Sequence, residues 1–222
     1  LAAQPIELDR VAPTGPSVSI EVDGVPLPVR PDLVYLLLNK PPGVISTAHD
    51  PQGRRTVVDL AATEASVYPV GRLDADSEGL ILLTNDGALT NLVTHPRYGI
   101  PKAYVVQLDG IPSSGDLRRL REGVGLEDGT ARARSARVID TSRGRTLVEI
   151  VMTEGKKREV RRMFDALGHP VLRLVRIAIG PIRDRTLKQG SARRLTVEEV
   201  RGLYSAAGAA WEDGPDPPES SR

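Results

Sequence analysis

A short acidic loop holds the first residue whose type could do chemistry. Asp74 lies in the stretch GRLDADSEGL, two residues after Arg72 and between two apolar segments that predict strands. A carboxylate in such a loop can lie on the floor of a cleft and act as a base or nucleophile, or it can simply cap a turn. Asp76 and Glu78 follow closely. We expect both to be solvated loop acids, because no apolar residues bracket them.

A tyrosine and a cationic run are the other candidates. Tyr104 lies in a predicted strand, 102–109, on the same face as Lys102. A tyrosine there can meet a ligand, although strand tyrosines more often pack in a core. After Gly155, five of the seven residues from Lys156 to Arg162 are cationic. At the start of a predicted helix they suit phosphate binding, or they form a solvated helix face with local ion pairs.

The composition excludes several kinds of site. The 222 residues include no cysteine, so disulfides, thiolate metal sites and cysteine nucleophiles are excluded. The three histidines are far apart, and we therefore expect no metal site. Of the 30 cationic residues 25 are arginine, which suits phosphate contacts, although a G+C-rich coding bias has the same effect. We see no membrane span and no signal peptide, and we expect a cytoplasmic protein.

The elements that must position these residues mix strands with helices. Period-two patterns predict strands, and period-3.6 patterns with caps predict helices. The predicted strands are 35–40, 67–73, 80–84, 102–109, 131–140, 146–155 and 171–180, and the predicted helices are 56–61, 86–95, 113–123, 158–168 and 196–204. Hairpins and helical crossovers both occur in this order. The pattern predicts an α+β fold with a mixed, mainly antiparallel sheet.

The chain divides into three segments. Residues 1–33 contain short strand-like runs around Asp23-Gly24 and are expected to be the end of a preceding module plus a linker. Residues 34–204 hold the periodic elements and form the expected main domain. Residues 205–222 are rich in Pro, Gly, Ser and acids, and we expect them to be a disordered tail.

Four motifs together resemble a known family. They are LLLNKPPGVIST (36–47), YPVGRLDADSEGLILLTNDGALTNLVTHP (68–96), PKAYVV (101–106) and EGKKREVRRMFDALGHPVLRLVRIAIG (154–180). In this order they resemble the RsuA-type family of bacterial rRNA pseudouridine synthases, over about residues 34–204. The REV form of the last motif resembles the large-subunit, RluB-like branch.

The resemblance implies a fold and an activity. The family has two α/β halves on one continuous sheet, flanked by helices, with a central cleft, and it isomerises uridine to pseudouridine without cofactor or metal. The implied partner is rRNA, most specifically 23S rRNA, met by a monomer that uses no membrane. The family also has an N-terminal S4-type RNA-binding module, of which 1–33 would be the tail.

The resemblance also implies roles for single residues. Asp74 would be the essential carboxylate acting on a flipped-out nucleotide, at C1′ as nucleophile or at C2′ as base; both options stay open. Tyr104 would stack on the uracil, and Arg161 would offset the buried charge of Asp74. The residues expected to bind RNA are Arg72, Lys40, Lys102, Lys156, Lys157, Arg158, Arg162, Arg54 and Arg55.

Three alternatives remain at this level. The RNA could be 16S rRNA or another structured RNA. The chain could be a non-catalytic RNA-binding assembly factor with the same fold, although Asp74, Tyr104 and Arg161 are all present. It could also be a glycosidase-like hydrolase, which needs two carboxylates flanking one bond and would use Asp76 or Glu78 as the second.

Overall fold

The computed structural model describes residues 20–22, 25–27 and 33–212. The chain forms two compact units, Leu1–Pro31 and Asp32–Arg222. In the first unit, β1 (Ile20–Val22) pairs with β2 (Val25–Leu27) in an antiparallel hairpin. This confirms the short strands expected there, while the Asp-Gly turn itself lies outside the described residues.

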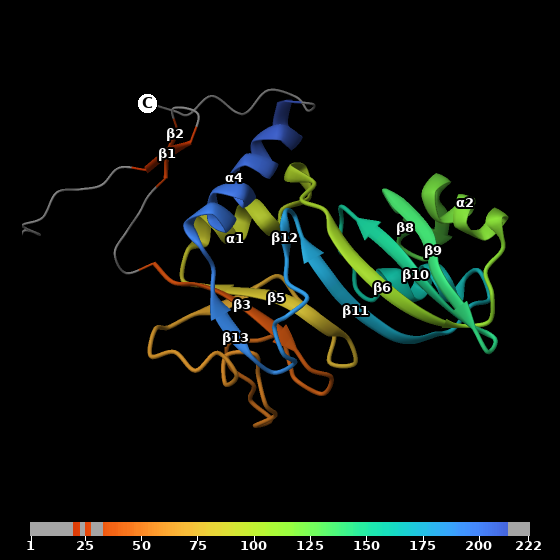
Figure 1. Ribbon diagram of the computed structural model, residues 1–222, viewed down its shortest axis with the longest axis horizontal. Helices are drawn as coiled ribbons and strands as arrows, with labels where there is room; N and C mark the ends of the chain where they lie inside the picture. Colours follow the sequence, from red (N-terminus) through yellow and green to blue (C-terminus); the bar gives the residue numbers. More distant parts are fainter. Residues whose placement is uncertain (1–19, 23–24, 28–32, 213–222) are drawn as a thin grey trace, which may run out of the picture. The chain divides into compact units, whose positions relative to one another are not determined.

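The second unit is built on a nine-stranded sheet (Figure 1). Its order is β13-β3-β5-β11-β6-β10-β9, with β4 paired to β5 and β12 paired to β11. The pairing of β5 with β11 is parallel and the other pairings are antiparallel, which confirms the mixed sheet. The strands are β3 (Tyr35–Lys40), β4 (Tyr68–Val70), β5 (Glu78–Thr84), β6 (Lys102–Asp109), β9 (Ser135–Ser142), β10 (Arg145–Met152), β11 (Val171–Ile179), β12 (Ile182–Arg183) and β13 (Ala192–Arg194).

The helices begin where capping residues satisfy their first amides. Asp86 accepts hydrogen bonds from the amides of Ala88 and Leu89, and Thr196 and Glu199 bond each other's amides reciprocally. The helices are α1 (Gly87–Thr94), α2 (Ser114–Glu122), α3 (Glu159–Asp165) and α4 (Val197–Glu212), with a 3₁₀ turn η1 (Pro96–Tyr98) and a hairpin of β7 (Val124–Leu126) with β8 (Gly129–Ala131).

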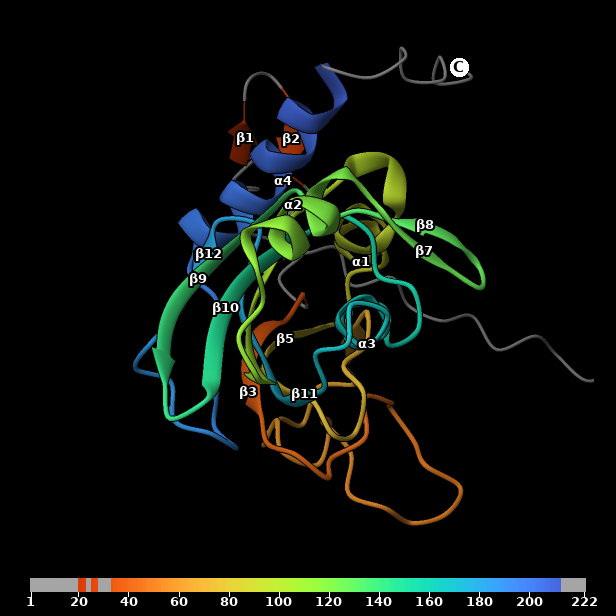
Figure 2. The ribbon, with the colours of Figure 1, turned by 90° about the vertical axis from the view of Figure 1, so that its right-hand side faces the viewer.

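The two faces of the sheet are covered differently in its two halves. On β3 and β5, α1 and α4 pack on one face through a cluster that includes Leu37 and Leu82. The loop 41–67 covers the other face of these strands, where Leu38 and Ile81 are buried. On β6, β10 and β11, helices α2 and α3 pack on one face (Figure 2). The segments that cover the two halves meet beside Tyr104, which packs against one hydrophobic cluster of each half.

Two sequence predictions about helices are wrong. Residues 56–61 form turns, because Thr56 and Asp59 exchange side-chain to amide hydrogen bonds that end the segment locally. The last helix does not stop at Tyr204 but continues to Glu212. Its alanine-rich sequence has high helix propensity, and Ala207 is buried against the core. Residues 205–212 are therefore helical, and the remainder of the expected tail lies outside the described residues.

Candidate active site

A pocket of about 420 Å³ opens where the two halves of the sheet meet. The loop before β5 contributes Asp74, and β6 and β11 contribute Tyr104 and Leu174. The turn into α3 contributes the remaining wall, Glu154–Val160. Three of the four motifs singled out in the sequence thus meet in one pocket because of the strand order.

The loop around Asp74 is held by its backbone. The Ser77 amide donates to the Asp74 carbonyl at 3.0 Å. The Ser46 hydroxyl donates to the Leu73 carbonyl at 2.8 Å, and the Leu73 amide donates back to it at 3.1 Å. The half-buried Asp74 carboxylate has no hydrogen bond or ion pair with any residue that the structure describes. A fixed backbone thus presents an unpaired carboxylate to the pocket, which suits a base or a nucleophile better than a turn cap.

Tyr104 serves both purposes considered from the sequence. Its ring packs against the core clusters of both sheet halves, and it also lines the pocket. Its hydroxyl has no hydrogen-bond partner among the described residues. Because packing already fixes the ring, Tyr104 loses little further rotamer freedom when its edge or face meets a planar ligand.

Arg161 lies on Asp76, not on Asp74. Its guanidinium donates to the Asp76 carbonyl at 3.1 Å, lies 3.4 Å from the Asp76 carboxylate, and donates to the Val171 carbonyl. Arg158 holds the same carboxylate with two 3.1 Å contacts. Arg161, expected to offset the charge of Asp74, thus makes no direct contact with that carboxylate, because the first turn of α3 lies over the end of the acidic loop. Arg161 is 8% exposed and braces that loop through Asp76.

Lys40 does not lie where RNA can reach it. Its side chain is fully buried, and its ammonium donates to the carbonyls of Pro41, Ala75 and Ser77. Burial lowers its pKa to about 8. The expectation that Lys40 binds RNA is wrong: the lysine ties the end of β3 to the acidic loop.

The other expected RNA-binding residues separate into two groups. Arg72, Lys156, Lys157 and Arg158 line the pocket. Arg162 and Arg54 are engaged in ion pairs with Asp128 and Asp50, the ammonium of Lys102 donates to the Val93 carbonyl, and Arg55 is exposed on the loop beside Arg54. The first group lies at the pocket, two of its members in ion pairs with Glu154 and Asp76, and a role in RNA binding remains a prediction for both groups.

Glu78 is not a solvated loop acid. It is the buried first residue of β5, and Arg173 donates to both of its carboxylate oxygens at 2.8 and 2.7 Å. Gln189 donates to it at 2.7 Å, and the Arg173 contact keeps the pKa of Glu78 below its usual range. It is buried because it belongs to β5, whose seven residues are all buried, so the acidic loop ends before residue 78. A carboxylate so engaged is a poor second acid for a hydrolase.

Glu159 is a pocket residue that the sequence analysis missed. It is 4% exposed at the first position of α3, and one carboxylate oxygen accepts from the Lys156 amide at 3.1 Å. The other oxygen is buried without a partner in the described part of the chain. Burial, with Glu154 nearby, raises the pKa of Glu159 to about 7. Its place in the first turn of a helix would have suggested only a capping role.

No group of three or more His, Asp or Glu side chains that could hold a metal occurs among the described residues. In the same part of the chain, none of the helices has the length and apolarity to cross a membrane.

The profile of one protein family, RNA pseudouridylate synthase, matches residues 34–166. The match spans the pocket from Asp74 to Glu159 and more than half of the chain. The chain belongs to this family. A family member from Bacillus subtilis, ribosomal large subunit pseudouridine synthase B, is 42% identical over 194 residues, covering 86% of this chain and 79% of the relative. Ribosomal large subunit pseudouridine synthase E of Xanthomonas axonopodis is 44% identical over 167 residues, 68% of this chain and 87% of the relative.

The solved structures of pseudouridine synthases agree with this assignment. The crystal structure of a pseudouridylate synthase superimposes with a TM-score of 0.70 at 31% identity, over 77% of this chain and 74% of that chain. This confirms the expected pseudouridine synthase fold. The protein is an RNA pseudouridine synthase, an isomerase, and the resemblance to the large-subunit branch agrees with the names of the two relatives.

Proposed function

We propose that the enzyme isomerises one uridine of 23S rRNA to pseudouridine, with the Asp74 carboxylate acting on the ribose of a flipped-out nucleotide. The observation that carries the proposal is the unpaired Asp74 carboxylate, which shares the pocket with the unbonded hydroxyl of Tyr104. Two relatives named for the large ribosomal subunit support the choice of RNA.

The reaction needs what this pocket offers. The bond from C1′ to N1 of the uracil breaks, the base turns, and a bond from C1′ to C5 forms. C5 then loses its proton while N1 gains one, so atoms balance without a cofactor. Asp74 acts at the sugar, and the Tyr104 ring holds the base while it turns. Stacking on an aromatic ring is worth about 1–3 kcal/mol per base.

Cationic side chains lie near Asp74, since Arg72, Lys156 and Arg158 line the same pocket. They also suit the phosphates that flank a flipped nucleotide, whose unstacking costs a few kcal/mol. Arg161 is a positioning residue in this proposal, since it touches Asp76 and not the space in front of Asp74.

The remaining parts of the proposal concern the setting. The enzyme acts as a cytoplasmic monomer without cofactor. Residues 34–204 form the catalytic domain, and residues 1–33 are the tail of an RNA-binding module. The relatives' names favour the large-subunit RNA over 16S rRNA, and the unpaired Asp74 favours catalysis over RNA binding alone.

Replacing Asp74 tests the function. Asp74→Asn keeps size and polarity but removes the charge, and we expect at least a 10³-fold loss of pseudouridine formation with unchanged rRNA affinity (about 4 kcal/mol of transition-state stabilisation). Tritium release from uridine labelled at C5 measures the reaction. Asp165→Asn, at an exposed position of α3, is the matched control and should behave as wild type.

Mapping decides the substrate. Pseudouridines in rRNA from cells with and without the gene should differ at one 23S position. A difference confined to 16S rRNA would contradict the choice of RNA, and wild-type activity in Asp74→Asn would contradict the catalytic assignment.

A further inference from the structure

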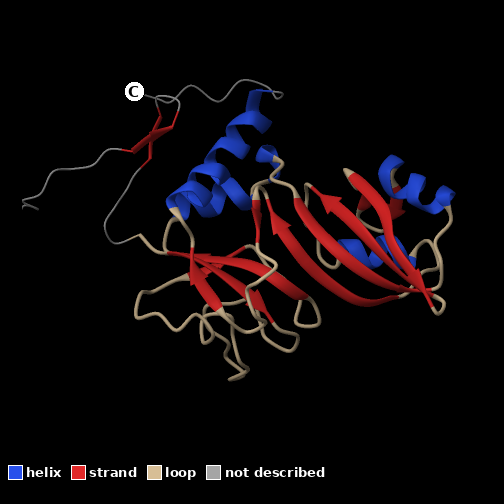
Figure 3. Ribbon diagram, in the orientation of Figure 1, coloured by secondary structure: helices blue, strands red, loops and turns tan. Residues whose placement is uncertain are grey.

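One face of the sheet is uncovered on the side opposite the active-site pocket. Side chains alternate along a strand, so Val105 and Val175 point away from the pocket residues Tyr104 and Leu174. Figures 1 and 3 show β11, β6, β10 and β9 with no helix in front of them, whereas α3 lies behind. We call the exposed side of these four strands, with the loop 183–187, the open face.

The open face is hollowed and lined by arginines. Three hollows of about 420, 430 and 390 Å³ lie along it. Two of them share Arg183, and residues of β6 and β10 line all three. The exposed arginines that line them are Arg134, Arg137, Arg143, Arg145, Arg183 and Arg185.

Few acids offset this charge. Arg137 is bonded to Glu149 at 3.0 Å. The other five exposed arginines make no ion pair with any residue in the described part of the chain. The buried Arg176, which lines the hollow beside Val175, has one guanidinium nitrogen without a hydrogen bond in the described part of the chain. Apart from Arg137, the exposed arginines of the open face therefore have no ion-pair partner among the described residues.

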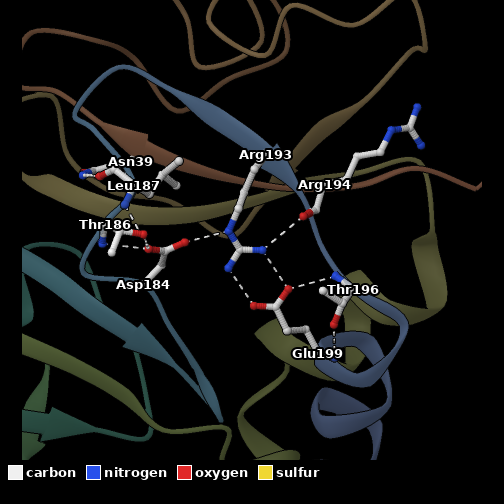
Figure 4. Close-up of polar contacts among 8 residues, drawn as sticks. All are labelled: Asn39, Asp184, Thr186, Leu187, Arg193, Arg194, Thr196 and Glu199. Atoms are coloured by element: carbon white, nitrogen blue, oxygen red, sulfur yellow. Dashed lines mark hydrogen bonds and ion pairs between the residues drawn. The ribbon is translucent and has the colours of Figure 1, made fainter.

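The loop that carries two of these arginines is held in place by an acid between them. Figure 4 shows the Asp184 carboxylate accepting from the amides of Thr186 and Leu187 and from Arg193. The carboxylate of Asp184 is thus engaged in hydrogen bonds within the protein. Arg183 and Arg185, one residue to either side, are exposed and line the hollow.

We propose that the open face is a second RNA-binding surface, which holds phosphates of the substrate RNA at a distance from the nucleotide in the pocket. The proposal rests on the proposed function, since it takes a large structured RNA as the substrate. Such an RNA extends far beyond a pocket of about 420 Å³. Arginine forks bind phosphate oxygens in pairs and stack on bases, so an arginine-lined sheet complements RNA in both charge and shape.

An RNA partner fits better than a protein partner. The apolar residues that line the open face are Ile139, which is 45% exposed, and the half-buried Val105, Val175 and Ile177. Around them lie six exposed arginines along three hollows, five of them without an ion pair among the described residues, and such a concentration of positive charge favours a polyanion such as RNA.

Charge reversal tests the surface. Binding of a 23S rRNA transcript is measured from about 50 to about 300 mM KCl for wild type and for the double variant Arg183→Glu with Arg185→Glu. We expect at least a tenfold weaker affinity, and a slope of log affinity against log salt that is smaller by about 2. Arg118→Glu with Arg119→Glu, on α2, changes the charge equally at exposed positions off the open face and should keep affinity within about twofold.

The outcomes are separable from those of the Asp74 test. Asp74→Asn reports on isomerisation, and RNA affinity reports on the open face. An unchanged affinity and slope in the Arg183/Arg185 variant, or an equal loss in the α2 control, would overturn the proposal. If the Arg183/Arg185 variant fails to fold, Arg143→Glu with Arg145→Glu, at the turn between β9 and β10, gives the same test. Loss of binding there alone supports the surface, and wild-type binding overturns it.

Discussion

At the scale of the residue, the pocket separates carboxylates by their surroundings. Asp74 has no partner and faces the pocket, while Asp76 is clamped by two arginines from the α3 region. Glu159 is the opposite case: it is buried, it bonds one backbone amide, and its pKa is raised to about 7. Three acids within one pocket region thus have three functions, because charge partners and burial differ at each.

Glu159 makes stability depend on pH near neutrality. In the folded protein the pKa of Glu159 is about 7, above the ordinary value of 4.5. The stabilising contribution of its protonated carboxyl to folding is therefore full below about pH 4.5 and is lost as the pH rises through 7. Glu159→Gln keeps an acceptor for the Lys156 amide but does not ionise. Relative to wild type, the variant should gain about 1–2 kcal/mol in unfolding free energy between pH 5 and 7.5.

Urea unfolding at several pH values measures this difference. The measurements end at about pH 7.5 because burial lowers the pKa values of Lys40 and Lys102 to about 8. Titration of these two lysines changes the unfolding free energy at higher pH. Glu122→Gln, at an exposed position, should show no trend. A pH-independent difference for Glu159→Gln would show that the carboxyl does not titrate in this range.

At the scale of the element, side chains that join elements fix the C-terminal part of the second unit. Arg193 of β13 donates to Asp184 at 2.6 Å and forks on both oxygens of Glu199 in α4, at 2.8 and 2.7 Å (Figure 4). Glu199 also caps its own helix by accepting from the Thr196 amide. One guanidinium therefore joins the loop 183–187, a sheet edge and the start of a helix.

Arg193→Ala should leave two acids without their shared partner. We expect a loss of about 1–3 kcal/mol in unfolding free energy at pH 7. The pKa values of Asp184 and Glu199 are both lowered by Arg193, so this difference is present above about pH 4.5 and shrinks as the pH falls.

Arg194 is the matched control for this change. Its exposed side chain points away from the cluster, and only its carbonyl accepts from Arg193 (Figure 4). Arg194→Ala should alter stability by no more than about 0.5 kcal/mol. Equal effects of the two substitutions in thermal unfolding would contradict the proposed bracing by Arg193.

At the scale of the whole second unit, the two halves of the sheet meet at one short parallel pairing. Val175 pairs with Glu78, and Arg176 pairs with Gly79. Gly79 has φ +103, and a Cβ there would lie 2.6 Å from the Arg176 nitrogen and closer still to its carbonyl oxygen. The strands approach closely because residue 79 has no side chain. The pocket forms at this junction, so its geometry depends on that approach.

Gly79→Ala should therefore cost more than backbone strain alone. We expect at least about 3 kcal/mol of lost stability, or no soluble protein, because backbone cannot move as a side chain can. Gly43→Ala separates the two effects, since Gly43 has φ +81 but nothing within 4 Å of an added Cβ. That control should cost about 1 kcal/mol. Similar melting temperatures for the two variants would contradict the close-approach argument.

The sequence by itself determined the local elements and the family. Period-two and period-3.6 patterns with caps identified the longer strands and most helices, because these signals lie within a few residues of one another, whereas the short strands β7, β8, β12 and β13 were not predicted. The prediction was wrong at 56–61, where hydrogen bonds between Thr56 and Asp59 form a turn in place of a helix. It was also wrong beyond Tyr204, where an alanine-rich sequence continues the last helix. The four motifs identified the family because their residues and order are specific.

Only the tertiary structure decided which charges meet. Arg161 and Asp76 lie 85 residues apart in the chain, and Arg173 lies 95 residues from Glu78. Their pairing depends on the parallel junction of β5 with β11 and on the position of α3 above it. A sequence shows which side chains carry charge, but their burial and partners follow from strand order and register. For that reason Asp74 and Tyr104 were identifiable as site candidates, whereas the partner of Arg161, the burial of Lys40 and the pocket position of Glu159 were not.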